Sequence, residues 1–511
     1  MDKNRDHHTH FLDEEWDVEK ALQQKREQRS GPQAAPVRQS PSPAPKSRKN
    51  RSSAPAPKGK PRSLMNRRDL LILAGLLAAI VLIIILVVVV VSRPSNDEPV
   101  ETEAFGPTYP LQYVAEDLVE QADVLATGYD YDAAIDLLLS FGDGWQGQEA
   151  LTEAKARYEE EKAALVRWAD TTTIPHVYFQ SLIVDTTRAF DGNSQENSYN
   201  QDMTTVTEFK AILEALYANN YVLVSLHDIA VLGKNEAGEE VYVQGDIYLP
   251  AGKKPLVMSQ DDVNYYDYMV DGNDDGTPDA QGDGFACQLV LDENGAITCK
   301  YIDADGQELY GDYDLVPILE AFIAEHPDFS YKGARAVLSV TGYEGVFGYD
   351  TTASDKEALG DEAYAEEVKQ ATAVAKWLRD NGWEIASHSY NHAAYGYNEV
   401  NTVLADLERW ESEVGSIVGE TDILFYPFGI DIAGEEDYSG SKYDAMYAKG
   451  FRYFCGTDSG EYWAQIKDDY VRQDRRALNG YYMYWWPELL DDLFDAKTIL
   501  DPARPEVPKK N

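Results

Sequence analysis

The stretch KPLVMSQDDVNYYDYM, residues 254–269, combines the pattern of a buried strand with a pair of acids. An apolar run from Pro255 to Met258 leads into two adjacent carboxylates, Asp261 and Asp262. Such a run is typical of a buried strand in an α/β protein, whose parallel strands carry functional groups at their C-terminal ends. Neighbouring side chains on an extended segment point to opposite faces, so the two acids are expected to have different roles.

The same pattern recurs from about residue 173 onward. Short apolar, β-branched runs predict seven strands, at 175–184, 221–226, 255–259, 335–342, 383–387, 422–428 and 451–457. Helix-periodic segments lie between them, at 204–220, 315–325, 361–381, 400–418 and 441–450. This alternation predicts right-handed β-α-β units and a parallel sheet, either closed into a barrel or left open.

Two further strand ends carry polar groups or a turn. The fifth strand runs into HSYNH, with His388 and His392 four residues apart, and the sixth runs into a Pro/Gly turn at 426–429. A histidine pair at this spacing suits a metal ion, and one carboxylate would complete a three-ligand site with room for water. The other carboxylate is then available as a general base. Each feature alone is also compatible with a surface histidine pair or a helix cap, but together they favour a metal-dependent hydrolase.

The region from about 173 to 485 resembles the polysaccharide deacetylases, the NodB-like domain of carbohydrate esterase family four. SQDD at 259–262 looks like that family's T-F-D-D motif, and HSYNH at 388–392 looks like its metal motif of two histidines, the first followed by Ser or Thr. FYPFG at 425–429 is similar to R-x-P-Y-G. The resemblance implies a distorted (β/α)7 barrel, which we assign to residues 171–490.

The resemblance also implies roles for individual residues. Asp261 would be the catalytic base, and Asp262, His388 and His392 would hold Zn²⁺, or Co²⁺ or a similar divalent ion. The backbone N–H of Phe428 would stabilise the oxyanion formed when water attacks an N-acetyl group. The implied activity is deacetylation of a polysaccharide.

Aromatic residues cluster beside these motifs, and flat rings suit sugars, although rings also fill cores and barrel rims. The residues predicted to contact substrate are Tyr265, Tyr266, Tyr395, Pro427 and Gly429.

The sequence departs from the family pattern at two places. Phe425 stands where the family has an arginine that pairs with the base; Arg472, Arg475 or Arg476 would have to supply that charge. No histidine follows His392, so the family's general acid has no counterpart. A glycan-binding or scaffold protein with little or no turnover, and an O-acetyl carbohydrate esterase, therefore remain as alternatives.

A calcium loop is a further possibility at DGNDDGTPD, residues 271–279. Asp271, Asn273, Asp275 and Asp279 have the spacing of calcium ligands, but Gly282 occupies the position where such loops have a glutamate. A plain polar turn is the alternative.

The three cysteines show no metal-ligand spacing. Cys287 and Cys299 flank QLVLDENGAIT, which predicts a hairpin with its turn at ENG. They could form a disulfide or remain as buried thiols.

The N-terminal part has a different organisation. Residues 1–69 hold 16 of the 45 Lys and Arg residues but 9 of the 89 Asp and Glu residues, and they are Pro/Ser-rich toward the end, which predicts a disordered basic arm. Residues 70–92 include 22 consecutive apolar residues, which predicts one transmembrane helix with the arm in the cytoplasm and the rest outside the cell. A linker at 93–110, a tetratricopeptide-like helical stalk at 111–170 and a C-terminal tail at 491–511 complete the predicted organisation.

The net charge of −44, concentrated in the predicted exterior part, argues against a nucleic-acid partner. A hydrolase that is anchored in the membrane and faces outward would meet the cell envelope, so we predict a cell-envelope polysaccharide, peptidoglycan or an associated polymer, as its substrate.

Overall fold

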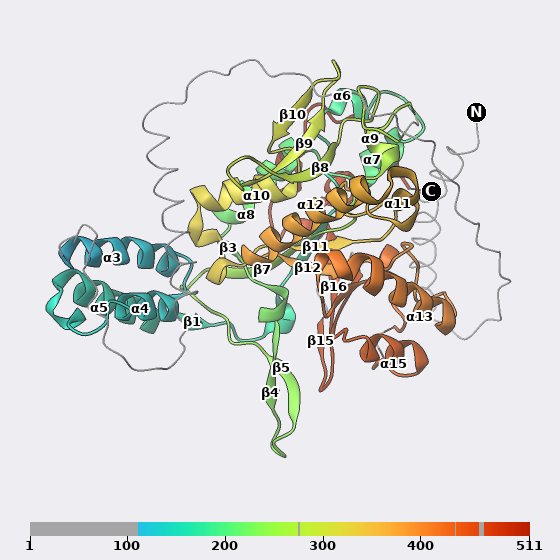
Figure 1. Cartoon of the computed structure of the whole chain (residues 1–511). Coiled ribbons are helices and arrows are strands. Elements are labelled where there is room, and N and C mark those ends of the chain that lie inside the picture. Colours follow the sequence, from blue (N-terminus) through green and yellow to red (C-terminus); the bar gives the residue numbers. More distant parts are fainter. Residues whose placement is uncertain (1–110, 274–275, 435, 459–463, 511) are drawn as a thin grey trace, which may run out of the picture. The chain divides into compact units, whose positions relative to one another are not determined.

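The computed structural model describes residues 111–273, 276–434, 436–458 and 464–510 (Figure 1). The arm, the apolar span and the linker predicted in residues 1–110 lie outside this part of the chain. Within it, no helix is long and apolar enough to cross a membrane.

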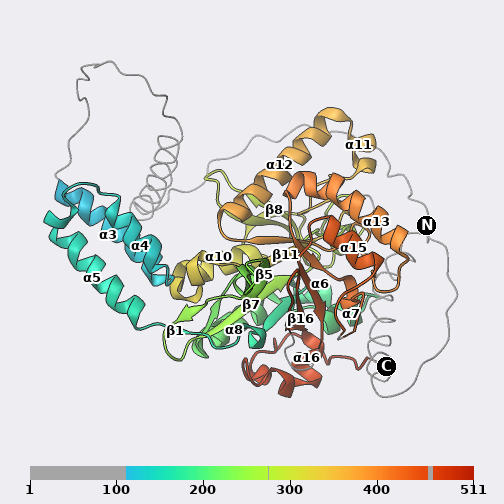
Figure 2. The ribbon, with the colours of Figure 1, turned by 90° about the horizontal axis from the view of Figure 1, so that it is seen from below.

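Seven parallel strands close into a barrel (Figures 1 and 2). In ring order they are β2 (His176–Phe179), β7 (Lys254–Gln260), β11 (Val337–Val340), β12 (Glu384–Ser387), β13 (Ile423–Phe425), β14 (Tyr453–Thr457) and β16 (Val471–Ala477). The parallel pairings of β7 with β11 and of β16 with β2 complete the ring. The predicted α/β class is confirmed, and of the two predicted arrangements the structure has the closed barrel and not the open sheet.

The barrel strands are short and buried on both faces. In β7, Leu256 and Met258 pack into the same cluster as Phe209 of a covering helix, whereas Val257 packs into another cluster with Phe425. Alternating side chains therefore reach two different apolar environments, as expected for strands covered by helices outside and by side chains inside.

Helices surround the strands (Figure 2). Those between the barrel strands are α6 (Thr186–Ala189), α7 (Glu196–Asp202), α8 (Val206–Ala218), α9 (Asp267–Val270), α10 (Leu315–Glu325), α11 (Ala353–Leu359), α12 (Asp361–Asp380), α13 (Val400–Arg409), α14 (Ser416–Val418) and α15 (Ser441–Ala448). Helix α16 (Gly480–Trp485) follows the last barrel strand. Each of the five predicted helical segments contains a helix. The start of α8 is fixed by a capping box, in which Thr205 and Glu208 bond reciprocally to each other's backbone N–H groups.

One of the seven predicted strands does not belong to the ring. β3 (Tyr221–Leu223), predicted at 221–226, pairs with β7 but takes no place in the closed circle. The seventh place belongs to β16, which the hydrophobic pattern did not predict. Its sequence VRQDRRA carries three arginines and an aspartate, yet all but Asp474 are buried. Their polar partners lie far away in the sequence, so local hydropathy does not reveal the strand.

An antiparallel sheet of three strands is inserted after β7, made of β8 (Ala286–Leu291), β9 (Ile297–Ile302) and β10 (Glu308–Gly311). The predicted hairpin is confirmed as β8 and β9. Cys287 and Cys299 are buried free thiols, because Cys299 lies opposite Leu289 and a register shift separates it from Cys287. The thiol alternative therefore holds.

The remaining strands are short. β1 (Val166–Arg167) pairs with β6 (Tyr248–Leu249), β4 (Ala230–Lys234) pairs with β5 (Glu240–Gln244), and β15 (Ala464–Ile466) pairs with β16, all in antiparallel fashion.

The predicted stalk region contains α3 (Leu111–Thr127), α4 (Tyr131–Leu139) and α5 (Glu149–Ala163). The link between α3 and α4 contacts the barrel domain: the backbone N–H of Lys332 donates to Gly128 O at 2.7 Å, and the Tyr129 hydroxyl donates to Asp328 O at 2.8 Å. The helices of the predicted stalk region therefore contact the barrel domain through the link between α3 and α4.

The C-terminal segment predicted as a tail packs against the barrel. Arg504 forms a buried ion pair with Glu208 of α8, and Val507 is fully buried.

His227 joins two neighbouring barrel strands at their N-terminal ends. Its Nδ1 bonds Glu384 of β12, and its Nε2 lies 2.9 Å from Asp422, next to β13. Burial alone would lower the pKa of His227, but the hydrogen bonds to Asp422 and Glu384 outweigh it and raise the pKa to about 10.

A charged His227 is therefore expected to stabilise the fold. A raised pKa means that this contribution is complete below the unfolded value of about 6.5 and is lost as pH rises toward about 10. The side chain is 44% exposed, and after screening by solvent we expect His227→Gln to cost about 1 kcal/mol at pH 6 and almost nothing at pH 10. Denaturant unfolding of both proteins across this pH range measures the difference, and a constant difference would contradict the charged state.

Candidate metal centre

Five polar side chains meet at the C-terminal ends of four barrel strands. Asp261 and Asp262 directly follow β7, His388 directly follows β12, Ser339 lies in β11 and Arg475 lies in β16. This is the end of a β/α barrel where functional groups gather, because parallel strands all end there.

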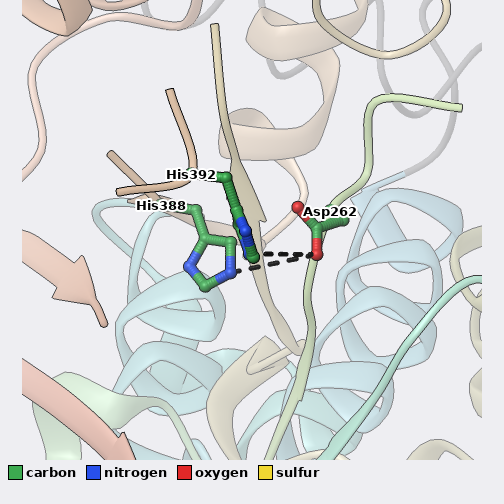
Figure 3. Close-up of side chains that lie close together, drawn as sticks. All are labelled: Asp262, His388 and His392. Atoms are coloured by element: carbon green, nitrogen blue, oxygen red, sulfur yellow. Dashed lines mark ion pairs between the residues drawn. The ribbon is translucent and has the colours of Figure 1, made fainter. Parts of the chain in front are cut away.

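Asp262, His388 and His392 form a buried group that could hold a metal ion (Figure 3). Oδ2 of Asp262 lies 3.9 Å from Nε2 of His388 and 3.8 Å from Nε2 of His392. These separations are too long for hydrogen bonds but leave space for a cation about 2.0–2.2 Å from each ligand atom. The three residues are 6%, 2% and 5% exposed, respectively. A His/His/carboxylate set of this kind fits Zn²⁺ or a similar divalent ion, with a coordination position left for water.

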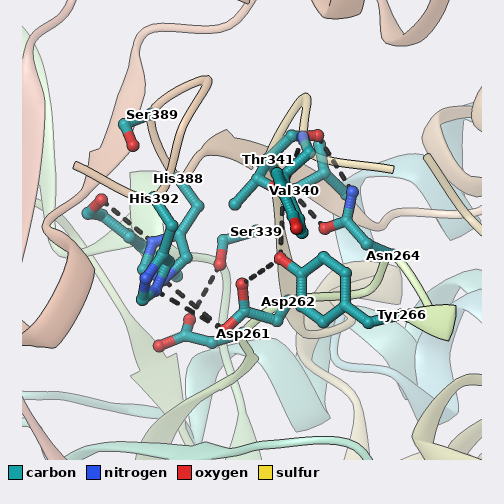
Figure 4. A network of polar contacts seen from close by, with 12 residues as sticks. Asp261, Asp262, Asn264, Tyr266, Ser339, Val340, Thr341, His388, Ser389 and His392 are labelled. Atoms are coloured by element: carbon teal, nitrogen blue, oxygen red, sulfur yellow. Dashed lines mark hydrogen bonds and ion pairs between the residues drawn. The ribbon is translucent and has the colours of Figure 1, made fainter. Parts of the chain in front are cut away.

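Hydrogen bonds orient two of the three ligands. Nδ1 of His388 lies 3.1 Å from the carbonyl oxygen of Phe425, so Nδ1 carries the proton and Nε2 presents its lone pair toward Asp262. The Tyr266 hydroxyl donates to Oδ1 of Asp262 at 2.7 Å and lies 2.9 Å from Oγ1 of Thr341 (Figure 4). This leaves Oδ2 of Asp262 facing the histidines.

The backbone around the ligands is strained. Asp262, Ser389 and His392 have φ values of 57°, 59° and 49°, in the left-handed region that non-glycine residues seldom adopt. Such conformations persist where the surrounding structure enforces them, and they gather at functional sites.

Burial favours the neutral imidazoles that a metal requires. It lowers the pKa of His388 below its ordinary value and lowers the pKa of His392 to about 3. Burial also raises the pKa of Asp262, whose charge a bound cation would compensate.

Asp261 lies in a different environment from Asp262, as we predicted from the opposite directions of neighbouring side chains on an extended segment. Arg475 donates from both terminal nitrogens to its carboxylate, at 2.6 and 2.9 Å, and the Ser339 hydroxyl donates at 2.9 Å. Burial would raise the pKa of Asp261, but the ion pair and hydrogen bonds with Arg475 outweigh burial and hold the pKa below its ordinary value. Asp261 is therefore an ionised carboxylate beside the candidate metal site.

Arg475 supplies the charge for which the sequence offered three candidates. It reaches Asp261 from a strand rather than from a loop, whereas Arg472 pairs with Asp431 and Arg476 pairs with Asp492. The Arg475 guanidinium lies 4.0 Å from the centre of the Phe425 ring. Phe425 thus provides an aromatic face on which the Arg475 guanidinium stacks.

The turn after β13 lies beside the histidines. The Phe428 ring is half-buried, and its centre is 4.3 Å from that of His392. Phe428 has φ of 58°, and Gly429 has φ of 64° with Oγ1 of Thr457 only 2.0 Å from where a Cβ would stand. Only glycine fits there, so this turn is built tightly next to the site. The role of the Phe428 N–H stays a prediction.

The predicted substrate residues lie around the site but are buried. Tyr265, Tyr266 and Tyr395 are 4%, 2% and 0% exposed, and their hydroxyls donate to Asp314, Asp262 and Asp406, respectively. Pro427 and Gly429 are buried as well. The three rings are buried with their hydroxyls bonded, and a role of these five residues in substrate binding stays a prediction.

The candidate calcium loop is only partly described, because Asp275 lies outside the described residues. Asp271 accepts the backbone N–H groups of Asn273 and Thr277, and Asp279 accepts that of Gln281. These bonds are those of a polar turn, and calcium binding stays a prediction.

Two supporting residues escaped the sequence argument. Ser339 lies in a strand that is otherwise apolar, so its hydroxyl gives no signal of a site. Asp406 lies on an amphipathic helix, where an acidic residue is usually exposed to solvent. Only the three-dimensional contacts identify them.

Known proteins show little similarity to this chain. No protein-family model and no curated protein matches the chain. Among solved structures, the chain is similar to the Streptococcus pyogenes deacetylase PplD in complex with acetate, with 10% identity, a TM-score of 0.32, and coverage of 62% of this chain and 94% of that one. A match of this size leaves the chain's own residues to define its chemistry.

Proposed function

We propose that the chain is a metal-dependent deacetylase that removes N-acetyl groups from a polysaccharide. One observation carries the proposal: an ionised, arginine-paired Asp261 lies next to the buried Asp262, His388 and His392 at the C-terminal end of the barrel. A protein that only binds glycans does not need a second carboxylate, kept ionised by an arginine, beside its metal site.

Each group has a definite task in this reaction. A divalent ion held by the triad would polarise the acyl carbonyl and acidify a water. Asp261, kept ionised by Arg475, accepts the proton of the attacking water. Asp262, His388 and His392 hold fixed positions, so little reorganisation is needed during the reaction.

The proposed location follows from the sequence alone. The run of 22 apolar residues within 70–92, flanked by basic residues on its N-terminal side, supports a single membrane anchor with the barrel outside the cell. A cell-envelope polysaccharide, such as peptidoglycan or an associated polymer, is then the substrate that the enzyme meets.

The first experiment measures metal content and acetate release of the purified full-length chain. We expect about one zinc or cobalt ion per chain and release of acetate from N-acetylated oligosaccharides. In the His388→Ala/His392→Ala variant we expect loss of both. A wild-type protein that takes up no divalent ion would exclude the proposed hydrolase.

An O-acetyl esterase is a second candidate, favoured by one observation. No histidine follows His392 in the sequence, so no imidazole is available to protonate a leaving amine from the last strands. An alcohol leaves with less help from an acid. Comparing kcat/KM for matched N- and O-acetylated sugars distinguishes the two, and preference for the ester would favour this candidate.

A further inference from the structure

The loop between the two histidine ligands is tied to a carboxylate on another element. Asp406 lies on α13 (Val400–Arg409) and is buried. Its Oδ1 accepts the backbone N–H of Tyr390 at 2.7 Å and the hydroxyl of Tyr395 at 2.7 Å. Its Oδ2 accepts the backbone N–H of Asn391 at 3.0 Å and Nδ2 of Asn391 at 2.8 Å.

All four donors belong to the segment that carries the ligands. Tyr390 and Asn391 lie between His388 and His392, and Tyr395 follows three residues after the second ligand. Both oxygens of Asp406 are thereby used on one tight turn. A charged acceptor makes each of these bonds stronger than a neutral one would.

The turn needs such support because its backbone is strained. Ser389 and His392 have positive φ values of 59° and 49°, which cost free energy unless surrounding contacts enforce them. If the turn relaxed, His392 would swing away from Asp262, since its position depends on the path of the intervening residues.

We propose that Asp406 is a positioning residue that holds the His388–His392 turn in the geometry required for metal binding. This inference rests on the proposed metal site but not on the acyl substrate. Asp406 touches neither ligand side chain; it acts through the backbone between them, as outer partners of metal ligands do.

A graded series of variants tests the proposal. Tyr395→Phe removes one of the four hydrogen bonds, Asp406→Asn replaces one acceptor oxygen by a donor, and Asp406→Ala removes all four. We expect the dissociation constant for Co²⁺ to rise in that order, reaching about 10- to 100-fold for Asp406→Ala. Titration of the metal-free full-length chain with Co²⁺, followed by visible absorption, measures both affinity and coordination geometry.

A matched control separates positioning from general destabilisation. Leu407 is the next residue on α13 and is buried in a hydrophobic cluster, so Leu407→Ala should lower the melting temperature without changing the Co²⁺ dissociation constant or spectrum. Glu413→Gln, which affects only the far hydroxyl of Tyr390 and a pair with Arg409, should also leave affinity unchanged.

The possible results are distinct. Wild-type affinity in Asp406→Ala would overturn the proposal, and so would an equal loss of affinity in Leu407→Ala. A wild-type chain that binds no Co²⁺ would overturn both this inference and the metal site. Tight Co²⁺ binding that depends on Asp406, without acetate release from any substrate, would support the inference and contradict the deacetylase function.

Discussion

Replacing Asp261 by Asn is expected to lower kcat for acetate release by about 10³-fold, the size of effect typical of a lost general base. The amide cannot accept the proton that the ionised carboxylate takes. Asn has nearly the same shape as Asp, so KM should change little. Metal content should stay near that of wild type, because Asp261 is not among the residues facing the candidate metal position. Steady-state kinetics and elemental analysis of the same preparation test both expectations.

The adjacent residue provides the control. Asp262→Asn weakens a predicted ligand, so this variant should lose metal and turnover together, whereas Asp261→Asn loses turnover alone. Ser339→Ala removes one hydrogen bond to Asp261 and should lower kcat by a much smaller factor. If Asp261→Asn kept more than a tenth of the wild-type kcat, another group would have to be the base.

The sequence was sufficient for the residues at the strand ends. Asp261, Asp262 and His388 each directly follow a buried apolar strand, and the ends of parallel strands in one barrel must lie near one another. His392 was included because of its spacing from His388. The fold class and the candidate metal triad both follow from this simple rule.

Other features depend on contacts between distant parts of the chain. β16 contains Arg472, Arg475 and Arg476, and its pattern is that of a surface strand or loop until Asp431, Asp261 and Asp492 are placed beside these arginines. For the same reason the sequence could not choose which arginine pairs with the base.

The burial of the aromatic rings could not be predicted from the sequence either. Tyr265, Tyr266 and Tyr395 lie beside the motifs in sequence, a position that is compatible with a sugar-binding surface or with packing in the core. In the structure each hydroxyl is bound to an aspartate, so each ring packs inward with its polar tip satisfied. Proximity in sequence therefore located the tyrosines correctly but could not show which way they face.

The second large effect concerns stability. Arg475→Met is expected to destabilise the fold by about 3–5 kcal/mol, because it leaves Asp261 as a buried charge without its partner. Met fills most of the space and keeps contact with Phe425. The double variant Asp261→Asn/Arg475→Met has no buried charge from this pair and should recover much of that loss while remaining inactive. Denaturant unfolding of the single and double variants measures the coupling between the two residues.

The pH dependence provides an independent test of the same pair. Arg475 holds the pKa of Asp261 below its ordinary value, so the stabilisation from this ion pair is present above about pH 4 and is lost as pH falls through the lower folded value. In Arg475→Met the pKa of Asp261 should rise, which moves the acid limb of the kcat/KM profile to higher pH. The stability difference between wild type and variant should also narrow as the solution becomes more acidic. An acid limb at the same pH in both proteins would mean that Arg475 does not set the charge of Asp261, and the base would then depend on the metal site alone for its ionised state.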